Sequence, residues 1–184
     1  MNHLMLDLET LGTRLNAPIV SIGAVFFDIT NATIGEHFYI VIDLNSSAQH
    51  GTIDADTVKW WMRQSDSARL VFNDTSAVSL VEALKQFSNF IVANSSYNSV
   101  KVWGNGINFD NMILREAYYQ VGMSPPWRYV NDRDVRTIVD LAHDITGIDV
   151  KATLRSGVAH NALDDAIHQA KYVSKAFQLI NLKM

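Results

Sequence analysis

The sequence contains no cysteine and no long apolar run. Without cysteine it can form neither a disulfide bond nor a thiolate metal site, so carboxylate and imidazole groups would have to hold any metal ion. No stretch of about 18 uncharged apolar residues is available for a membrane-spanning helix. The first residues, MNHLMLDLET, also lack the basic region and cleavage site of a signal peptide. We therefore expect a soluble, cytoplasmic protein with no membrane partner.

An excess of positive charge is missing as well. There are 15 lysines and arginines against 19 aspartates and glutamates, so the formal net charge is −4. Proteins that bind nucleic acid over a long footprint are usually basic, and this balance argues against that mode of binding. A short footprint is still compatible with the charge, because carboxylates that hold divalent cations are neutralised by them.

Length and periodicity predict the fold. A chain of 184 residues with 48% hydrophobic content fits a single domain, residues 1–184. Apolar, β-branched and aromatic runs predict strands at 4–10, 18–28, 35–44, 100–105 and 127–132. Helical spacing predicts helices at 54–64, 79–95, 111–122, 135–146 and 163–180, with Asp56 or Ser79 as possible N-caps. A three-stranded meander followed by a β-α-β-α order indicates an α/β fold with a mixed five-stranded sheet flanked by helices.

The last predicted helix orients two adjacent aspartates differently. Its apolar stripe, which should pack on the sheet, consists of Leu163, Ala166, Ala170, Val173, Phe177 and Ile180. Relative to the centre of this stripe, Asp164 faces solvent, whereas Asp165 lies on the flank and can reach over the sheet edge. His160 precedes Asp165 by five residues, so the two converge only if His160 lies in the loop 151–160 or in the first helical turn.

Four carboxylates and one histidine suggest a catalytic site. Asp7 and Glu9 stand at i and i+2 in a strand, so they share one face and repel each other unless a cation lies between them. Asp110 follows a predicted parallel strand, at the edge where open α/β sheets bind ligands. Together with Asp165 they could hold two divalent ions, Mg²⁺ or Mn²⁺, which clamp the oxygens of a phosphate displacement. His160 is suited to take the proton from the attacking water.

The same residues carry a resemblance to a known family. Residues 7–10 (Asp-Leu-Glu-Thr), 108–110 (Asn-Phe-Asp) and 160–165 (His-Asn-Ala-Leu-Asp-Asp) resemble the three motifs of the DnaQ-like, DEDDh superfamily of 3′→5′ exonucleases. The resemblance spans almost the whole chain and implies an RNase H-like fold. It also implies a catalytic site in which Asp7, Glu9, Asp110 and Asp165 are metal ligands and His160 is the general base.

A narrower resemblance concerns the substrate. The segments 57–61 (Thr-Val-Lys-Trp-Trp) and 103–106 (Trp-Gly-Asn-Gly) resemble a subgroup of phage exodeoxyribonucleases and bacterial exoribonucleases. The family implies that Thr10 and Leu11 contact the 3′-terminal nucleotide. We also predict Asn108 as a substrate contact, although many members of the family have a different sequence before the acid that corresponds to Asp110. Trp60 and Trp61 point about 100° apart on a helix, so one can pack in the core while the other stacks on a base. The pattern leaves open which of them stacks, and Trp61 enters the predicted substrate site.

The predicted function is a metal-dependent 3′→5′ exonuclease that releases nucleoside 5′-monophosphates from single-stranded DNA or RNA. The sequence does not decide between the two nucleic acids, and the resemblance suggests a homodimer. A non-catalytic nucleic-acid-binding module on the same fold is the alternative, but it would be expected to have lost a ligand. A phosphatase with an aspartate nucleophile would need an aspartate in place of Glu9. We assign no role to His3, His37, His50, His143 and His168. Arg133, Arg136 and Arg155 could contact phosphate, but we read them as surface charges.

Overall fold

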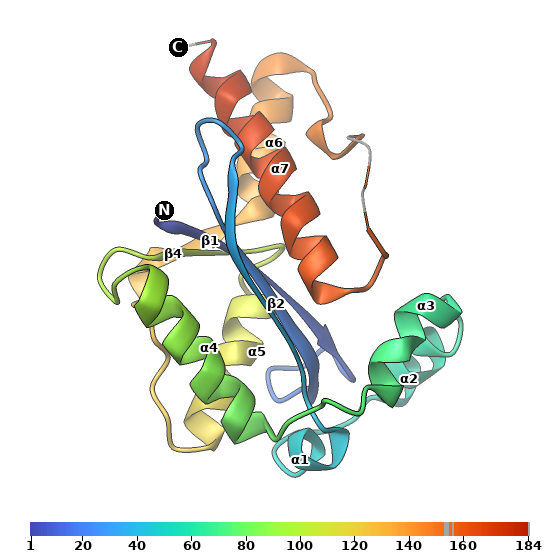
Figure 1. Ribbon diagram of the computed structural model, residues 1–184. Coiled ribbons are helices and arrows are strands. Elements are labelled where there is room, and N and C mark those ends of the chain that lie inside the picture. Colours follow the sequence, from blue (N-terminus) through green and yellow to red (C-terminus); the bar gives the residue numbers. More distant parts are fainter. Residues whose placement is uncertain (153–154, 156, 184) are drawn as a thin grey trace.

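A mixed five-stranded sheet forms the centre of the molecule (Figure 1). The computed structural model describes residues 1–152, 155 and 157–183. β1 (His3–Thr10), β2 (Ile19–Phe27) and β3 (Ile34–Val41) form an antiparallel meander. β4 (Lys101–Gly104) and β5 (Asp132–Asp134) extend it in parallel on the other side of β1, which gives the order β3-β2-β1-β4-β5. The predicted α/β fold with a mixed sheet is confirmed.

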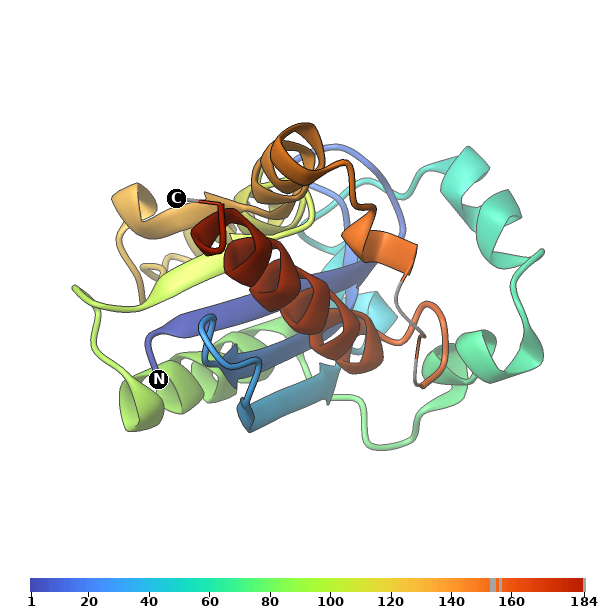
Figure 2. The same cartoon turned by 90° about the horizontal axis from the view of Figure 1, so that it is seen from above.

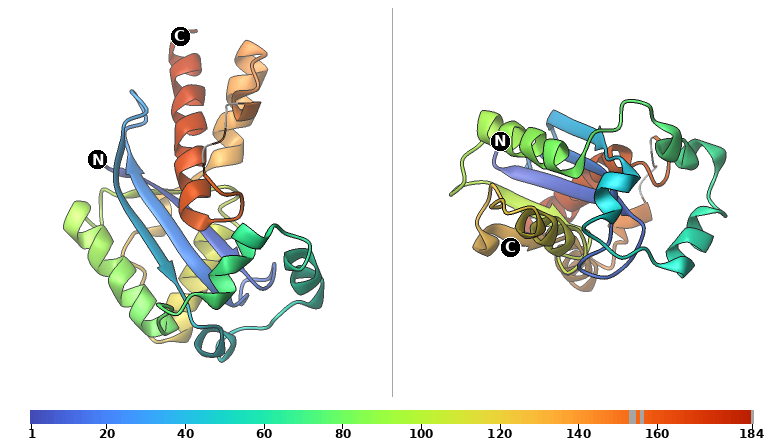
Figure 3. Two further views of the ribbon diagram at one scale, coloured as in Figure 1. Left: turned by 45° about the vertical axis from the view of Figure 1, so that its right-hand side comes forward. Right: turned by 90° about the horizontal axis from the view of Figure 1, so that it is seen from below.

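Helices cover both faces of this sheet. α4 (Leu80–Asn94) and α5 (Asp110–Gln120) pack on one face, and α6 (Val135–Thr146) and α7 (Ala162–Asn181) pack on the other (Figures 1 and 3). Seen from above, α7 crosses obliquely over the strands (Figure 2). The shorter elements are α1 (Leu44–Ala48), α2 (Ala55–Trp61), α3 (Asp66–Arg69) and the 3₁₀ turns η1 (Leu70–Asn73), η2 (Tyr129–Asn131) and η3 (Val150–Ala152). In the described part of the chain, no helix has the length and apolarity needed to cross a bilayer.

The alternation of side chains along β1 decides which face carries the acidic residues. Leu4 and Leu6 point into the core under α4 and α5, whereas Met5 belongs to the core under α6 and α7. Because successive side chains of a strand point to opposite faces, Asp7 and Glu9 share the face of Met5. The two carboxylates therefore lie on the side of the sheet that α7 covers.

The start of helix α7 comes very close to the sheet at Gly23 of β2. Gly23 pairs with Asp7 in the antiparallel register. A Cβ atom on Gly23 would lie 2.1 Å from the carbonyl carbon of Ala162, so no side chain fits there. Glycine in a strand commonly marks such a close approach of another backbone. The first turn of α7 consequently rests directly on β2, beside Asp7.

The fifth strand is the main error of the predicted fold. It was expected at 127–132 but comprises Asp132–Asp134, and η2 occupies part of the expected range. Trp127 is almost fully buried, and its indole N–H donates to Asp132 Oδ1 at 2.7 Å. The aromatic side chain therefore anchors a loop to the core. The polar residues of β5 become a strand through pairing with β4, which outweighs their low β-propensity.

Smaller differences concern element ends. Ser79 caps α4 as predicted, but Asp54, and not Asp56, caps α2 through the N–H of Asp56. The third strand ends at Val41 because the carboxylate of Asp43 caps α1. The predicted stripe of α7 is confirmed by Ala166, Ala170 and Val173, which are all fully buried. The expected loop 151–160 falls partly outside the described residues, at positions 153, 154 and 156.

Candidate active site

A pocket of about 850 Å³ opens at the carboxyl end of β1. Its walls come from β1, α2, the start of α5 and the start of α7. The residues that the sequence predicted as catalytic all line it, namely Asp7, Glu9, Asp110, His160 and Asp165. Segments that lie far apart in the sequence thus converge on one cavity.

A free backbone group of β1 positions Asp110. β4 pairs with β1 only as far as Met5, so the N–H groups further along that edge of β1 have no strand partner there. The N–H of Leu8 donates to Asp110 Oδ1 at 3.1 Å. Asp110 is the first residue of α5 and is 3% exposed. The end of β4 and the start of α5 thereby place this carboxylate beside Asp7 and Glu9.

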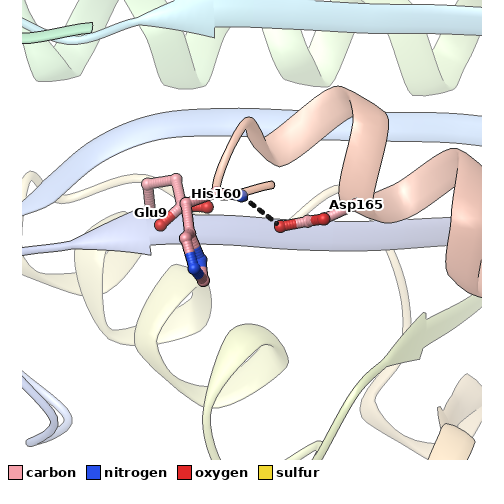
Figure 4. Close-up of side chains that lie close together, drawn as sticks. All are labelled: Glu9, His160 and Asp165. Atoms are coloured by element: carbon pink, nitrogen blue, oxygen red, sulfur yellow. Dashed lines mark hydrogen bonds between the residues drawn. The ribbon is translucent and has the colours of Figure 1, made fainter. Parts of the chain in front are cut away.

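The opposite wall is formed by the turn before α7 (Figure 4). Glu9, His160 and Asp165 each have a potential ligand atom within 4.8 Å of the others. The backbone N–H of His160 donates to Asp165 Oδ2 at 3.0 Å, and φ of His160 is +65°. This left-handed conformation puts His160 in a turn outside the helix, as the sequence predicted. Asn161 then caps α7 by accepting hydrogen bonds from the N–H groups of residues 163 and 164.

The two adjacent aspartates of α7 play different parts. Asp165 lines the pocket, whereas Asp164 accepts a hydrogen bond from the N–H of Val158 at 2.7 Å. The predicted choice of Asp165 as the pocket residue is in line with this geometry. Asp164 is partly exposed, so the expectation that it faces solvent holds in part, and its carboxylate also holds the turn that carries His160.

The carboxylates are desolvated and close to one another. Burial, followed by the nearby charge of Asp110, raises the pKa of Glu9 to about 8. Burial also raises the pKa of Asp110 to about 7, although backbone N–H groups oppose that shift. The pKa of Asp7 lies well above its usual value because of burial and then because of Asp110 and Glu9. Without an added cation, the cluster therefore retains protons at neutral pH.

The donor set fits divalent ions. Carboxylate oxygens are the ligands that Mg²⁺ and Mn²⁺ prefer, and a neutral imidazole is compatible with Mn²⁺. Close, buried carboxylates with raised pKa values would be stabilised by added positive charge, because Arg155 and Arg136 lower their pKa values only in part. Asp7, Glu9, Asp110 and Asp165 are the residues that could hold such ions.

Arg155 supplies part of the missing positive charge. It forms an ion pair with Asp165, and its guanidinium lowers the pKa values of Asp7 and Glu9. Arg155 is exposed, as predicted for a surface charge, and it also lines the pocket. His168, to which we gave no role, lines the pocket as well, and burial lowers its pKa. Its position three residues after Asp165 on the helix was the available signal.

The two tryptophans of α2 have separate environments. Trp61 is 3% exposed, and its indole N–H donates to the carbonyl of Thr10 at 2.9 Å. Trp60 is 39% exposed and lines the pocket, with its ring 4.7 Å from the ring of His160. The assignment of Trp61 to the substrate site is corrected on this geometry, because its ring belongs to the core. Trp60 is the residue that presents a face to the cavity.

The other predicted substrate contacts divide in the same way. Thr10 lines the pocket, whereas Leu11 packs with Trp61 in a small core. Asn108 is exposed and is not among the residues that line the pocket. Asn105 and Phe109 occupy the corresponding wall. The turn after β4 points these neighbours inward and leaves Asn108 outside.

Gln169 is a buried pocket residue that the sequence analysis missed. Its Nε2 donates to Asp7 Oδ1 at 2.7 Å, and the residue is 5% exposed. It stands four residues after Asp165, so both side chains lie on one face of α7. That spacing was the signal that could have found it.

Comparisons with known proteins place this sequence and fold among nucleases. Residues 2–177 match the family model described as 3'-5' exoribonuclease Rv2179c-like domain. The exodeoxyribonuclease of Enterobacteria phage T4 is 28% identical over 192 residues, which cover 90% of this chain and 84% of that protein.

Two solved structures extend the comparison to the fold. Cell-death related nuclease 4 (CRN-4) superposes with a TM-score of 0.70 at 16% identity, over 98% of this chain and 64% of that one. The nuclease domain of 3'hExo, a DEDDh family member bound to rAMP, gives a TM-score of 0.60 at 13% identity, over 96% and 91% of the two chains. The fold is thus the RNase H-like fold of the DnaQ-like exonucleases. Because the family model covers nearly the whole sequence, the chain belongs to the family of Rv2179c-like 3′-5′ exoribonuclease domains.

Proposed function

We propose that this chain hydrolyses phosphodiester bonds from the 3′ end of single-stranded DNA or RNA and releases nucleoside 5′-monophosphates. The observation that carries the proposal is the convergence of four carboxylates and His160 in one pocket. The ligands are Asp7, Glu9, Asp110 and Asp165, and they would hold two Mg²⁺ or Mn²⁺ ions. When bound, such ions activate a water molecule and stabilise the leaving oxygen.

His160 is the proposed general base. Burial and then the charge of Arg155 lower the pKa of His160, so its imidazole is neutral at neutral pH. A neutral imidazole can accept the proton of the attacking water. The hydrogen bond from its backbone N–H to Asp165, together with the packing of its ring against Trp60, fixes the residue beside the carboxylates.

Trp60 is the proposed stacking surface for a base of the substrate. Its ring is partly exposed in the pocket, and stacking of a base on an aromatic side chain is worth about 1–3 kcal/mol. Trp60→Ala should therefore raise KM for a short oligonucleotide by roughly tenfold and change kcat much less. Tyr129→Ala, which removes an exposed ring outside the pocket, is the control and should leave KM unchanged. A KM unaffected by Trp60→Ala would remove Trp60 from the substrate site.

The direct test uses single-stranded oligonucleotides with either end labelled. With Mg²⁺ or Mn²⁺, a 3′ label should appear at once in a mononucleotide, while a 5′ label should appear in a ladder of shortening products. Matched DNA and RNA strands should be compared, because the family model is named for an exoribonuclease and the phage relative for an exodeoxyribonuclease. Internal cleavage, activity in the presence of excess chelator, or binding without shortening would each contradict the proposal. The last result would favour the non-catalytic alternative.

A further inference from the structure

Strand β1 and helix α7 face each other with matching spacings. Residues two apart on a strand are separated by roughly 6.5–7 Å, and residues four apart on a helix rise by about 6 Å. Glu9 lies opposite Asp165, with potential ligand atoms within 4.8 Å. Asp7 lies opposite Gln169, whose Nε2 is 2.7 Å from Asp7 Oδ1. The second pair thus repeats the first, with an amide in place of a carboxylate.

Only one of the two polar groups of the Gln169 amide makes a hydrogen bond among the described residues. In the structure, Gln169 Nε2 donates to Asp7 Oδ1. The same orientation is required once bound ions ionise the Asp7 carboxylate, because an ionised carboxylate accepts hydrogen bonds and cannot donate. Oε1 then has no hydrogen-bond partner among the residues that the structure describes, although it is buried. Gln169 also lines the pocket. An unpaired buried acceptor lowers stability, so an apolar side chain would serve packing better.

We propose that Gln169 is a positioning residue for Asp7. Its Nε2 fixes the orientation of the Asp7 carboxylate, and its unpaired Oε1 accepts a hydrogen bond from water that enters the pocket with a divalent ion. The inference rests on the ion-binding part of the proposed function. A glutamine suits this task because it supplies the hydrogen bond without adding a fifth negative charge beside Asp7.

Mn²⁺ binding without nucleic acid tests the inference. Gln169→Met keeps the length of the side chain and removes both hydrogen-bonding groups. Partners that orient metal ligands typically change affinity 10–100-fold, so calorimetry should show a loss of about that size. Gln178→Leu is the matched control on α7, because the Gln178 amide donates to the backbone of Thr30 far along the helix and should leave Mn²⁺ affinity unchanged. Wild-type affinity in a folded Gln169→Met variant would overturn the inference.

Two further measurements separate positioning from general damage. Circular dichroism and melting in excess chelator report whether Gln169→Met folds, and Gln169→Leu replaces it if it does not. At saturating oligonucleotide, raising Mn²⁺ by roughly the lost factor in affinity should restore kcat to within a few-fold of the wild type. A kcat that stays low at every Mn²⁺ concentration would contradict the positioning role. If the wild type binds Mn²⁺ but shortens no strand, the proposed function fails while the binding comparison still decides the role of Gln169.

Discussion

The structure buries acidic groups in two places, around Asp132 of β5 and in the carboxylate pocket at the end of β1, and the two differ in their charge balance. In the Asp132 cluster, Arg115 pairs with Asp132 at 3.2 Å, and both side chains are largely buried. Asn111 and Trp127 donate further hydrogen bonds to Asp132 Oδ1 at 2.8 and 2.7 Å, and Arg115 stacks on the Trp127 ring at 4.7 Å. In the carboxylate pocket, acidic groups face one another, and the nearby Arg155 and Arg136 do not prevent their pKa values from rising.

The contrast shows two ways in which a protein can bury a carboxylate. A buried carboxylate is tolerated when charge and hydrogen bonds within the chain satisfy it, as for Asp132. Where the chain does not supply that compensation, the carboxylates keep protons or take up cations from solution, as in the pocket. Breaking each cluster should therefore have opposite consequences for stability.

The largest expected effect follows from neutralising Asp7. Asp7→Asn removes one carboxylate from the pocket. Activity should fall by about 10³-fold or more, because the bound ions lower the activation barrier by several kcal/mol. The melting temperature in chelator should rise, since repulsion and desolvation both raise the pKa of Asp7 in the wild type. Asp66→Asn on the exposed helix α3 is the control. Unchanged exonuclease activity in Asp7→Asn would exclude the two-ion assignment.

His160→Ala should slow turnover and preserve ion binding. Loss of a general base costs about 10²–10⁴-fold in rate, whereas Mn²⁺ affinity should stay close to that of the wild type. Calorimetry and single-turnover rates on the same preparation check this, with the exposed His143→Ala as control. The imidazole lies close enough to Glu9 and Asp165 to be a ligand itself. A parallel loss of Mn²⁺ affinity would make His160 a ligand and not the base.

Arg115→Met should break the balanced cluster. Asp132 would then be buried without its cation, so the free energy of unfolding should fall by about 3–5 kcal/mol in urea denaturation. The stabilisation that Mn²⁺ adds should be the same as in the wild type, because the pocket is unchanged. Arg69→Met, which breaks an exposed ion pair, should cost less than about 1 kcal/mol. If Arg115→Met also lowered the free energy of unfolding by less than about 1 kcal/mol, the buried ion pair would contribute little to stability.

The smallest expected effect is a pH dependence of the ion-free protein. The folded-state pKa values of Glu9 and Asp110, about 8 and about 7, lie above those of the unfolded chain. The folded state then binds more protons than the unfolded state between roughly pH 4.5 and 8, so stability decreases as pH rises through this window. Melting in chelator between about pH 7.5 and 8.5 stays above the window in which His3, whose pKa is lowered from 6.5 to about 4, makes stability rise with pH. A flat profile in this range would contradict the raised pKa values.

The sequence predicted the parts of this site that depend on periodicity. Alternation along β1 put Asp7 and Glu9 on one face, and helical phase selected Asp165 over Asp164 for the pocket. The five-residue gap placed His160 before the helix, where it lies. These inferences hold because each concerns a single regular element whose geometry is set by the backbone alone.

The failures concern contacts between elements. Nothing local distinguishes Trp60 from Trp61, and the carbonyl of Thr10 decides which indole is buried. Arg155 pairs with Asp165, but no periodic pattern in the sequence around Arg155 predicts this contact. β5 becomes a strand because β4 lies beside it and Trp127 fastens the preceding loop. Tertiary partners override local propensity at all these places.

Gly23 gives the site a dependence on a residue that bears no functional group. Its bare backbone sets the separation between β2 and the first turn of α7, on which His160 and Asp165 depend for their approach to Glu9. The arrangement of the proposed catalytic residues therefore depends on the absence of a side chain at position 23. A substitution at position 23 should therefore disturb the pocket, although it would change none of the proposed ligands, the proposed base or any charge.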